Sequence, residues 1–146
     1  MNADLMKELA MIGGYAAVAL AAIGSAIGTG IAGQAAVAAW KRCYGQNKPA
    51  PFLLIALAGA PLSQTIYGMI MMMLINSGSK GGIFYCAMGI FAGAALMVSA
   101  VFQGKAAAGS CDAFGETGKG FTNYLTVCGI VETVALFALV FGIMVI

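Results

Sequence analysis

Only twelve of the 146 residues are charged, and their positions constrain the fold more than any other feature of the sequence. They leave four long runs that hold a single charge among them: 9–40, 49–79, 81–104 and 120–146. Each run is longer than the roughly 20 apolar residues that a helix needs to cross a membrane. Since 62% of the chain is hydrophobic and only 8% is charged, a water-soluble globular domain is excluded.

The four runs predict an all-α membrane protein, with four transmembrane helices arranged as two tandem hairpins. We expect one domain over 1–146, with helices at about 9–42, 49–77, 83–110 and 119–146. As helices, the first two runs would be about 45 Å long or longer. The hydrocarbon core of a bilayer is only about 30 Å thick. These helices must therefore tilt, protrude from the membrane, or break near their ends.

The basic residues predict the orientation in the membrane. Five of the seven lie in the first and third connections between runs, and only Lys7 and Lys80 lie on the other side. Basic residues concentrate in the cytoplasmic loops of membrane proteins. We therefore expect a multi-pass protein of the cell membrane with both hairpin loops in the cytoplasm and both termini outside. Residues 1–8 carry two acids and one base, unlike the basic start of a signal peptide.

Several function classes are excluded by what the sequence lacks. No histidine is present, which removes the commonest general base and metal ligand. The four cysteines have no CxxC spacing, so we expect free structural thiols rather than a zinc site. A net charge of +2, scattered along the chain, argues against nucleic acid as a partner. No GxxxxGK[ST] motif occurs, so we expect no catalytic site for ATP and no enzymatic activity in this chain alone.

Glycines are concentrated in the first and third runs, where they allow close approach of helix backbones in lipid. One interpretation is ordinary association of helices within one bundle. The other is a crowded inner layer where many copies meet, with the bulkier second and fourth helices facing lipid. The glycines in question are Gly24, Gly28, Gly30, Gly33, Gly89 and Gly93.

One carboxylate, Glu132, lies near the centre of the last run. An ionised carboxylate there costs about 2.5–3.5 kcal/mol on insertion scales, so such residues are functional by default. Glu132 can escape this cost by taking a proton or by binding a cation. The structural alternative is a carboxyl group that only hydrogen-bonds helices together, which Asn or Gln would do without the cost of a charge.

The second run offers polar partners at the same depth. Gln64 lies at its middle, Ser63 precedes it, and Tyr67 follows Ser63 by one helical turn. Pro61 has no N–H group and interrupts the helical hydrogen bonds, which can turn the Ala60 carbonyl out of the ladder. Irregular backbone at membrane depth is tolerated where it lines a site. The alternatives are a simple kink at Pro61 and an interfacial anchor at Tyr67.

Gln103 is a polar residue near the end of the third run. Counted from the outer side it lies about 30 Å along its helix, against about 21 Å for Glu132. This difference in depth shrinks if residues 81–85 form the outer connection rather than helix. The alternative is a polar side chain that approaches the water boundary beside Lys105.

Three motifs carry a resemblance to a known family: APLSQTIYG at 60–68, FQGKAAAG at 102–109 and VET at 131–133. Together they resemble the K subunit, or proteolipid c subunit, of bacterial V-type (V/A-type) ATPases, particularly the Na⁺-translocating members. The resemblance implies a rotor ring of identical subunits in the membrane. It also implies a stator subunit whose arginine displaces the ion, a central stalk subunit at the cytoplasmic loops, surrounding lipid, and partner subunits that hydrolyse ATP.

The resemblance also implies an ion site, with Na⁺ as the transported ion and H⁺ as the alternative. The family's sodium members usually carry Thr where this chain has Ser63, which bears on the affinity for the ion more than on its identity. Oxygen ligands of this kind suit a hard cation, whereas a proton needs little more than the carboxyl group. The implied ligands are Glu132, Gln103, Gln64, Ser63 and the backbone carbonyl of Ala60 before Pro61, with Tyr67 supporting Glu132.

Two other function classes remain as alternatives. A small four-helix exporter could use one membrane carboxylate for substrate and proton, but its acid usually lies in the first helix, where this chain has none within the span. A purely structural proteolipid would keep its function after the change Glu132→Gln.

Overall fold

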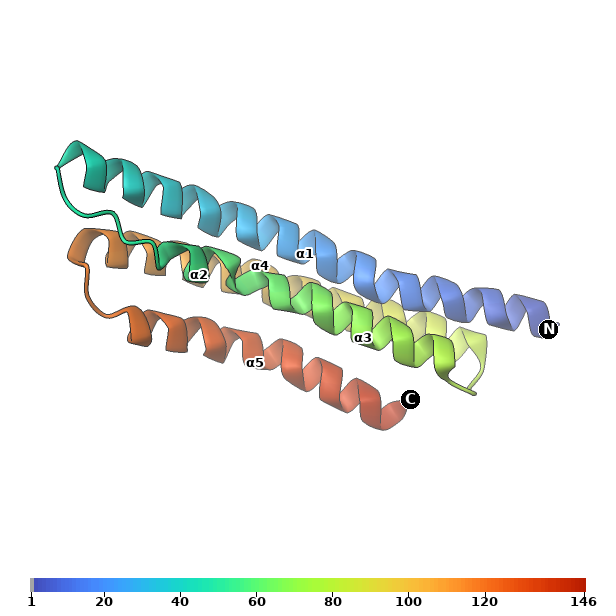
Figure 1. Ribbon diagram of the computed structural model, residues 1–146. Coiled ribbons are helices and arrows are strands. Elements are labelled where there is room, and N and C mark those ends of the chain that lie inside the picture. The colour runs from blue at the N-terminus through green and yellow to red at the C-terminus, as the bar shows by residue number, and fades with distance from the viewer. Residues whose placement is uncertain (1) are drawn as a thin grey trace.

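The computed structural model describes residues 2–146, which form long helices lying side by side (Figure 1). No strand occurs in this part of the chain, and four spans are long and apolar enough to cross a membrane, so the predicted all-α membrane fold with two tandem hairpins is confirmed. The second span, Leu54–Ser77, consists of two helices joined by a 3₁₀ turn. The elements are α1 (Ala3–Gly45), α2 (Leu54–Gly59), η1 (Ala60–Leu62), α3 (Ser63–Ser77), α4 (Gly82–Thr117) and α5 (Phe121–Val145).

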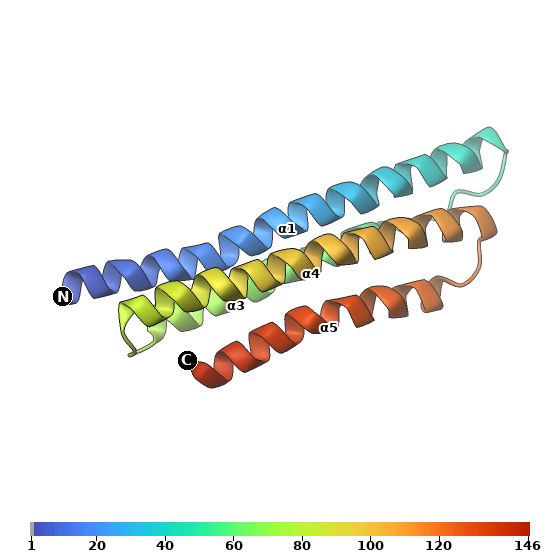
Figure 2. The same ribbon diagram turned by 180° about the vertical axis from the view of Figure 1, so that it is seen from behind.

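The two hairpin connections lie at one end of the molecule, and the N- and C-terminal ends of the described chain lie at the other with the 78–81 connection (Figures 1 and 2). The second hairpin turns on two glycines. Gly118 ends α4 with φ +64°, and Gly120 precedes α5 with φ +83°. Both values lie in the left-handed region that glycine adopts without steric cost. An ion pair between Arg42 and Asp112 joins α1 to α4 near the same end.

The helices extend beyond the expected bounds at some ends and fall short at others. α1 begins at Ala3 rather than near residue 9 and runs unbroken for 43 residues, about 65 Å, so it protrudes from a bilayer. α4 continues to Thr117 rather than about 110. The second span begins at Leu54 rather than about 49, because Pro49 and Pro51 disfavour helical conformation in the residues before them.

Glycines bring the backbones of α1 and α4 into contact. A Cβ atom added to Gly104 would lie 2.6 Å from the carbonyl carbon of Gly28, and one added to Gly93 would lie 2.9 Å from the Cα of Ala17. Gly24 and Gly89 make equally close approaches to the partner helix. Packing within one chain therefore accounts for these four predicted packing glycines, Gly24, Gly28, Gly89 and Gly93.

Two other predicted packing glycines have a different setting. A Cβ atom added to Gly30 or Gly33 would meet nothing within 4 Å in the described chain. Both lie on a side of α1 that the other helices of the same chain leave uncovered. α5 also presents much of its surface outward, since only Cys128, Ala135, Leu139 and Gly142 are buried along its 25 residues.

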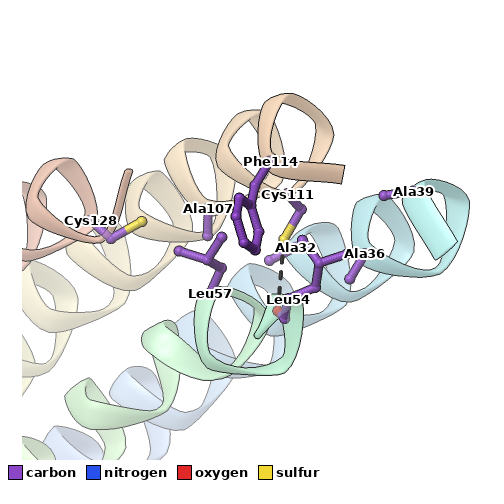
Figure 3. Close-up of a cluster of buried hydrophobic side chains, with 9 residues drawn as sticks. All are labelled: Ala32, Ala36, Ala39, Leu54, Leu57, Ala107, Cys111, Phe114 and Cys128. Atoms are coloured by element: carbon purple, nitrogen blue, oxygen red, sulfur yellow. Dashed lines mark hydrogen bonds between the residues drawn. The ribbon is translucent and has the colours of Figure 1, made fainter. Parts of the chain in front are cut away.

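A buried apolar cluster near the hairpin-loop end holds α2 between α1 and α4 (Figure 3). The Cys111 thiol lies 3.9 Å from the Leu54 carbonyl oxygen, and the Trp40 indole N–H donates to the Pro51 carbonyl at 2.8 Å. These contacts fix α2, and therefore the 3₁₀ turn that follows it. The members of the cluster are Ala32, Ala36, Ala39, Leu54, Leu57, Ala107, Cys111, Phe114 and Cys128.

Candidate functional site

The carboxylate of Glu132 accepts hydrogen bonds on both of its oxygens. The Tyr67 hydroxyl of α3 donates to Oε1 at 2.6 Å, and the Gln103 carboxamide of α4 donates to Oε2 at 3.0 Å. Hydrogen bonds to an ionised group are about twice as strong as those between neutral groups. Three helices therefore meet at the only acidic residue within the four charge-poor runs.

Gln103 and Gln64 connect this carboxylate to the second span. Gln64 Nε2 donates to Gln103 Oε1 at 2.7 Å, and Gln103 Nε2 donates to both Glu132 and the carbonyl oxygen of Cys128, the latter at 3.2 Å. Both glutamine side chains have 0% exposure. The result is a chain of two carboxamides that ends at the carboxylate, and Gln103 is no surface residue approaching the water boundary.

The 3₁₀ turn at Pro61 supplies further oxygens. Because proline donates no backbone hydrogen bond, the helix narrows over Ala60–Leu62, and the Ala60 N–H bonds Leu57 three residues back. The Ala60 carbonyl oxygen lies 3.2 Å from the Ser63 hydroxyl, which in turn lies 3.3 Å from Gln64 Oε1. The proline interruption therefore adds a backbone carbonyl to the group of side-chain oxygens.

Gln103 and Glu132 lie at the same depth, although counting residues from the outer ends of their helices predicts different depths. α4 begins at Gly82, close to the expected start at about 83, so residues 82–85 are helical and do not reduce this difference. Instead, α5 ends short of the turn between α3 and α4 (Figure 1). Lys80 reaches across this gap and donates to the carbonyl of Val145. The distances of Gln103 along α4 and of Glu132 along α5 are therefore measured from helix ends that lie at different depths. The two side chains lie at the same depth and share a hydrogen bond.

All the residues proposed as ligands or supports of the site thus lie in one hydrogen-bonded network. The sequence did not point to the Cys128 carbonyl, although Cys128 precedes Glu132 by one turn of the same helix. It also did not point to Ser99, which is 4% exposed and donates to the Val131 carbonyl at 3.4 Å. Both are small residues in apolar runs, and only the α4–α5 contact reveals them.

The network places one carboxylate among neutral oxygens. Between residues 2 and 146, no group of three or more His, Cys, Asp or Glu side chains could hold a metal ion. The oxygens available are carboxylate, carboxamide, hydroxyl and backbone carbonyl, which are the ligands of hard cations. The same arrangement can also hold a proton on Glu132, with Tyr67 and Gln103 as hydrogen-bonding neighbours.

Residues 86–145 match the family model of the ATP synthase C subunit. This family is the ion-translocating rotor component of rotary ATPases, a non-catalytic part that assembles into rings. The matched segment contains Gln103 and Glu132, whereas the first hairpin with Gln64 lies outside it. The match supports the proteolipid family and a multi-pass membrane protein. No curated protein matches the chain.

Proposed function

We propose that this chain is a rotor-ring subunit of a V-type rotary ATPase that carries Na⁺ across the membrane by reversible binding at Glu132. The proposal rests chiefly on the network that joins Glu132 to Gln103, Gln64 and Ser63. The family match of the second hairpin and the three sequence motifs support it. ATP would be hydrolysed by partner subunits.

The charge of Glu132 explains why a bound cation matters. A bare carboxylate in lipid is costly, and a Na⁺ ion held by it leaves the site neutral. The carboxamide oxygens of Gln103 and Gln64, the Ser63 hydroxyl and the Ala60 carbonyl would complete the ligand set around Glu132. Tyr67 would keep donating to the carboxylate and so hold it in place.

The surroundings of the site suit a ring. Glu132 and Tyr67 are half-buried in the single chain, and Leu136, one turn after Glu132 on the same face of α5, is 38% exposed. Lipid or a neighbouring copy would cover this surface, and an arginine of the stator subunit would displace the ion there. By the excess of basic residues, the two hairpin loops would face the cytoplasm and contact the central stalk.

Carbodiimide labelling tests the identity of the ion. The carbodiimide takes up the proton of the carboxyl group and its carbon is then attacked by the carboxyl oxygen, so a bound Na⁺ ion that replaces the proton protects the residue. We expect millimolar Na⁺ at neutral pH to slow labelling of Glu132 at least tenfold, and the same concentration of K⁺ to have little effect.

The alternative cargo gives a different result. If the rotor carries protons, Glu132 will be labelled equally fast with and without Na⁺, and only a rise in pH will protect it. Labelling mapped to another carboxyl group would contradict the central role of Glu132 for either ion.

A further inference from the structure

Ser25, in the middle of α1, carries an unpartnered buried hydroxyl. Its side chain is 2% exposed, and its Oγ is the one buried side-chain nitrogen or oxygen without a hydrogen-bond partner among residues 2–146. A buried polar atom without a partner destabilises the folded chain, and Ala would fit the same space without that penalty. In native structures such an atom marks strain, an ordered water or ion, or a functional role.

Two contacts define the register between α1 and the second span, which run in opposite directions (Figure 1). A Cβ atom added to Gly68 would lie 2.8 Å from the Cβ of Ala21. A Cβ atom added to Gly28 would lie 2.9 Å from the Cβ of Pro61. Seven residues separate the two contacts on both segments, so the register is the same at both.

Ser25 lies between these two contacts on the same face of α1, four residues after Ala21. Its counterpart in the register is Gln64, which lies four residues before Gly68. Side chains four apart on a helix share a face, so Ser25 and Gln64 lie opposite each other. Both are buried, at 2% and 0% exposure.

The hydrogen bonds of Gln64 leave room for this partner. Its carboxamide has two N–H groups. Within the described chain, Nε2 makes one bond, to Gln103 Oε1. If Gln103 Oε1 turns to ligate a cation, it is lost as an acceptor, and a buried N–H of Gln64 needs another one.

We propose that Ser25 is a positioning residue of the ion site, whose hydroxyl accepts a hydrogen bond from the Gln64 carboxamide when the cation is bound. This inference rests on the proposed function. The serine proton would then go to the Ala21 carbonyl one turn back, as serine does within helices. Ser25 thereby holds Gln64 with its oxygen toward the ion, without touching the ion itself.

The variant Ser25→Ala tests the proposal in the assembled ring. The concentration of Na⁺ that half-protects Glu132 from carbodiimide should rise about five- to tenfold, the effect of one lost hydrogen bond. The labelling rate without Na⁺ should not change, because Ser25 acts only on the loaded site. Ser25→Thr, which keeps the hydroxyl, should restore most of the affinity.

Ser110→Ala is the matched control. Ser110 is also a buried serine, but its hydroxyl already donates to the Ala106 carbonyl of its own helix at 2.8 Å. We expect its half-protecting Na⁺ concentration to equal that of the unchanged protein. Melting followed by circular dichroism in detergent checks that all three variants stay folded, which the small size of Ala favours at Ser25 and Ser110.

The outcomes separate the two proposals. If Ser25→Ala binds Na⁺ as well as the unchanged protein, or if Ser25→Thr is as weak as Ser25→Ala, the positioning role is wrong while the Na⁺ rotor stands. If Na⁺ fails to protect the unchanged protein, the proposed sodium function is wrong and the role of Ser25 falls with it.

Discussion

At the scale of single residues, Glu132 is held by donors from two other helices. Tyr67 and Gln103 each donate to one carboxylate oxygen. Neither donor carries a charge, so the carboxylate is oriented without being neutralised. This leaves its full charge available to a cation or proton, which a lysine or arginine in the same place would cancel.

Tyr67→Phe removes one of these donors and keeps the aromatic ring. We expect the half-protecting Na⁺ concentration at Glu132 to rise about ten- to hundredfold, because a hydrogen bond to a charged group contributes about 1.5–3 kcal/mol. The measurement is again carbodiimide labelling against Na⁺ concentration.

Tyr15→Phe provides the control for this substitution, since Tyr15 lies on α1 with 70% exposure and should leave Na⁺ protection unchanged. Equal Na⁺ protection in Tyr67→Phe and the unchanged protein would show that the tyrosine does not support the site.

Sequence reasoning reaches some of these residues and not others, for physical reasons. Ser63, Gln64 and Tyr67 lie within five residues of one helix, so their proximity follows from helix geometry alone. Gln103 depends on how far α4 and α5 slide past each other, which no local pattern determines. Ser25 is a small residue in a Gly- and Ala-rich run, where a hydroxyl is indistinguishable from packing until the opposite helix is in place.

At the scale of elements, the contact between α1 and α4 depends on the absence of side chains. The Gly28 and Gly104 backbones are in direct contact, which places Gln103, the residue before Gly104, at its depth. The run of glycines predicted close packing but not the partner. Within the chain, Gly24 and Gly28 of α1 pack on α4, and Gly89 and Gly93 of α4 pack on α1, whereas Gly30 and Gly33 remain open.

Gly104→Ala should disrupt this contact. Its Cβ would meet backbone atoms of Gly28, which cannot move aside as a flexible side chain can, so we expect a loss of about 1–3 kcal/mol in stability. Thermal unfolding in detergent, followed by circular dichroism, should show a melting temperature several degrees lower.

The control is Gly109→Ala on the same helix, where an added Cβ meets nothing within 4 Å in the described chain. It should melt at or slightly above the temperature of the unchanged protein, because Ala favours helix more than Gly does. Equal melting of the two variants would contradict the close α1–α4 contact.

At the scale of the whole molecule, Glu132→Gln separates transport from assembly. Gln has nearly the same shape and can still accept a hydrogen bond from Tyr67, but it neither ionises nor binds a cation strongly. We expect ATP-driven Na⁺ uptake by vesicles holding the complete ATPase to be abolished. Native mass measurement in mild detergent should still show rings.

Two results would contradict this separation. Transport that survives the substitution would favour a structural proteolipid. Finding only monomers or dimers of the unchanged protein would count against a rotor. A substitution at the outward-facing Val134, for example Val134→Leu, is the control that should leave both uptake and assembly intact.

The ratio of helices to carboxylates has a consequence for energy conversion. The four charge-poor runs hold one acidic residue, Glu132, while the corresponding middle of the first hairpin holds the neutral Gln64. A ring built from such chains moves half as many ions per revolution as one of equal size with an acid in every hairpin. Because each ATP then moves fewer ions, more of its free energy is available to each ion. Such a rotor can therefore drive each ion against a steeper gradient.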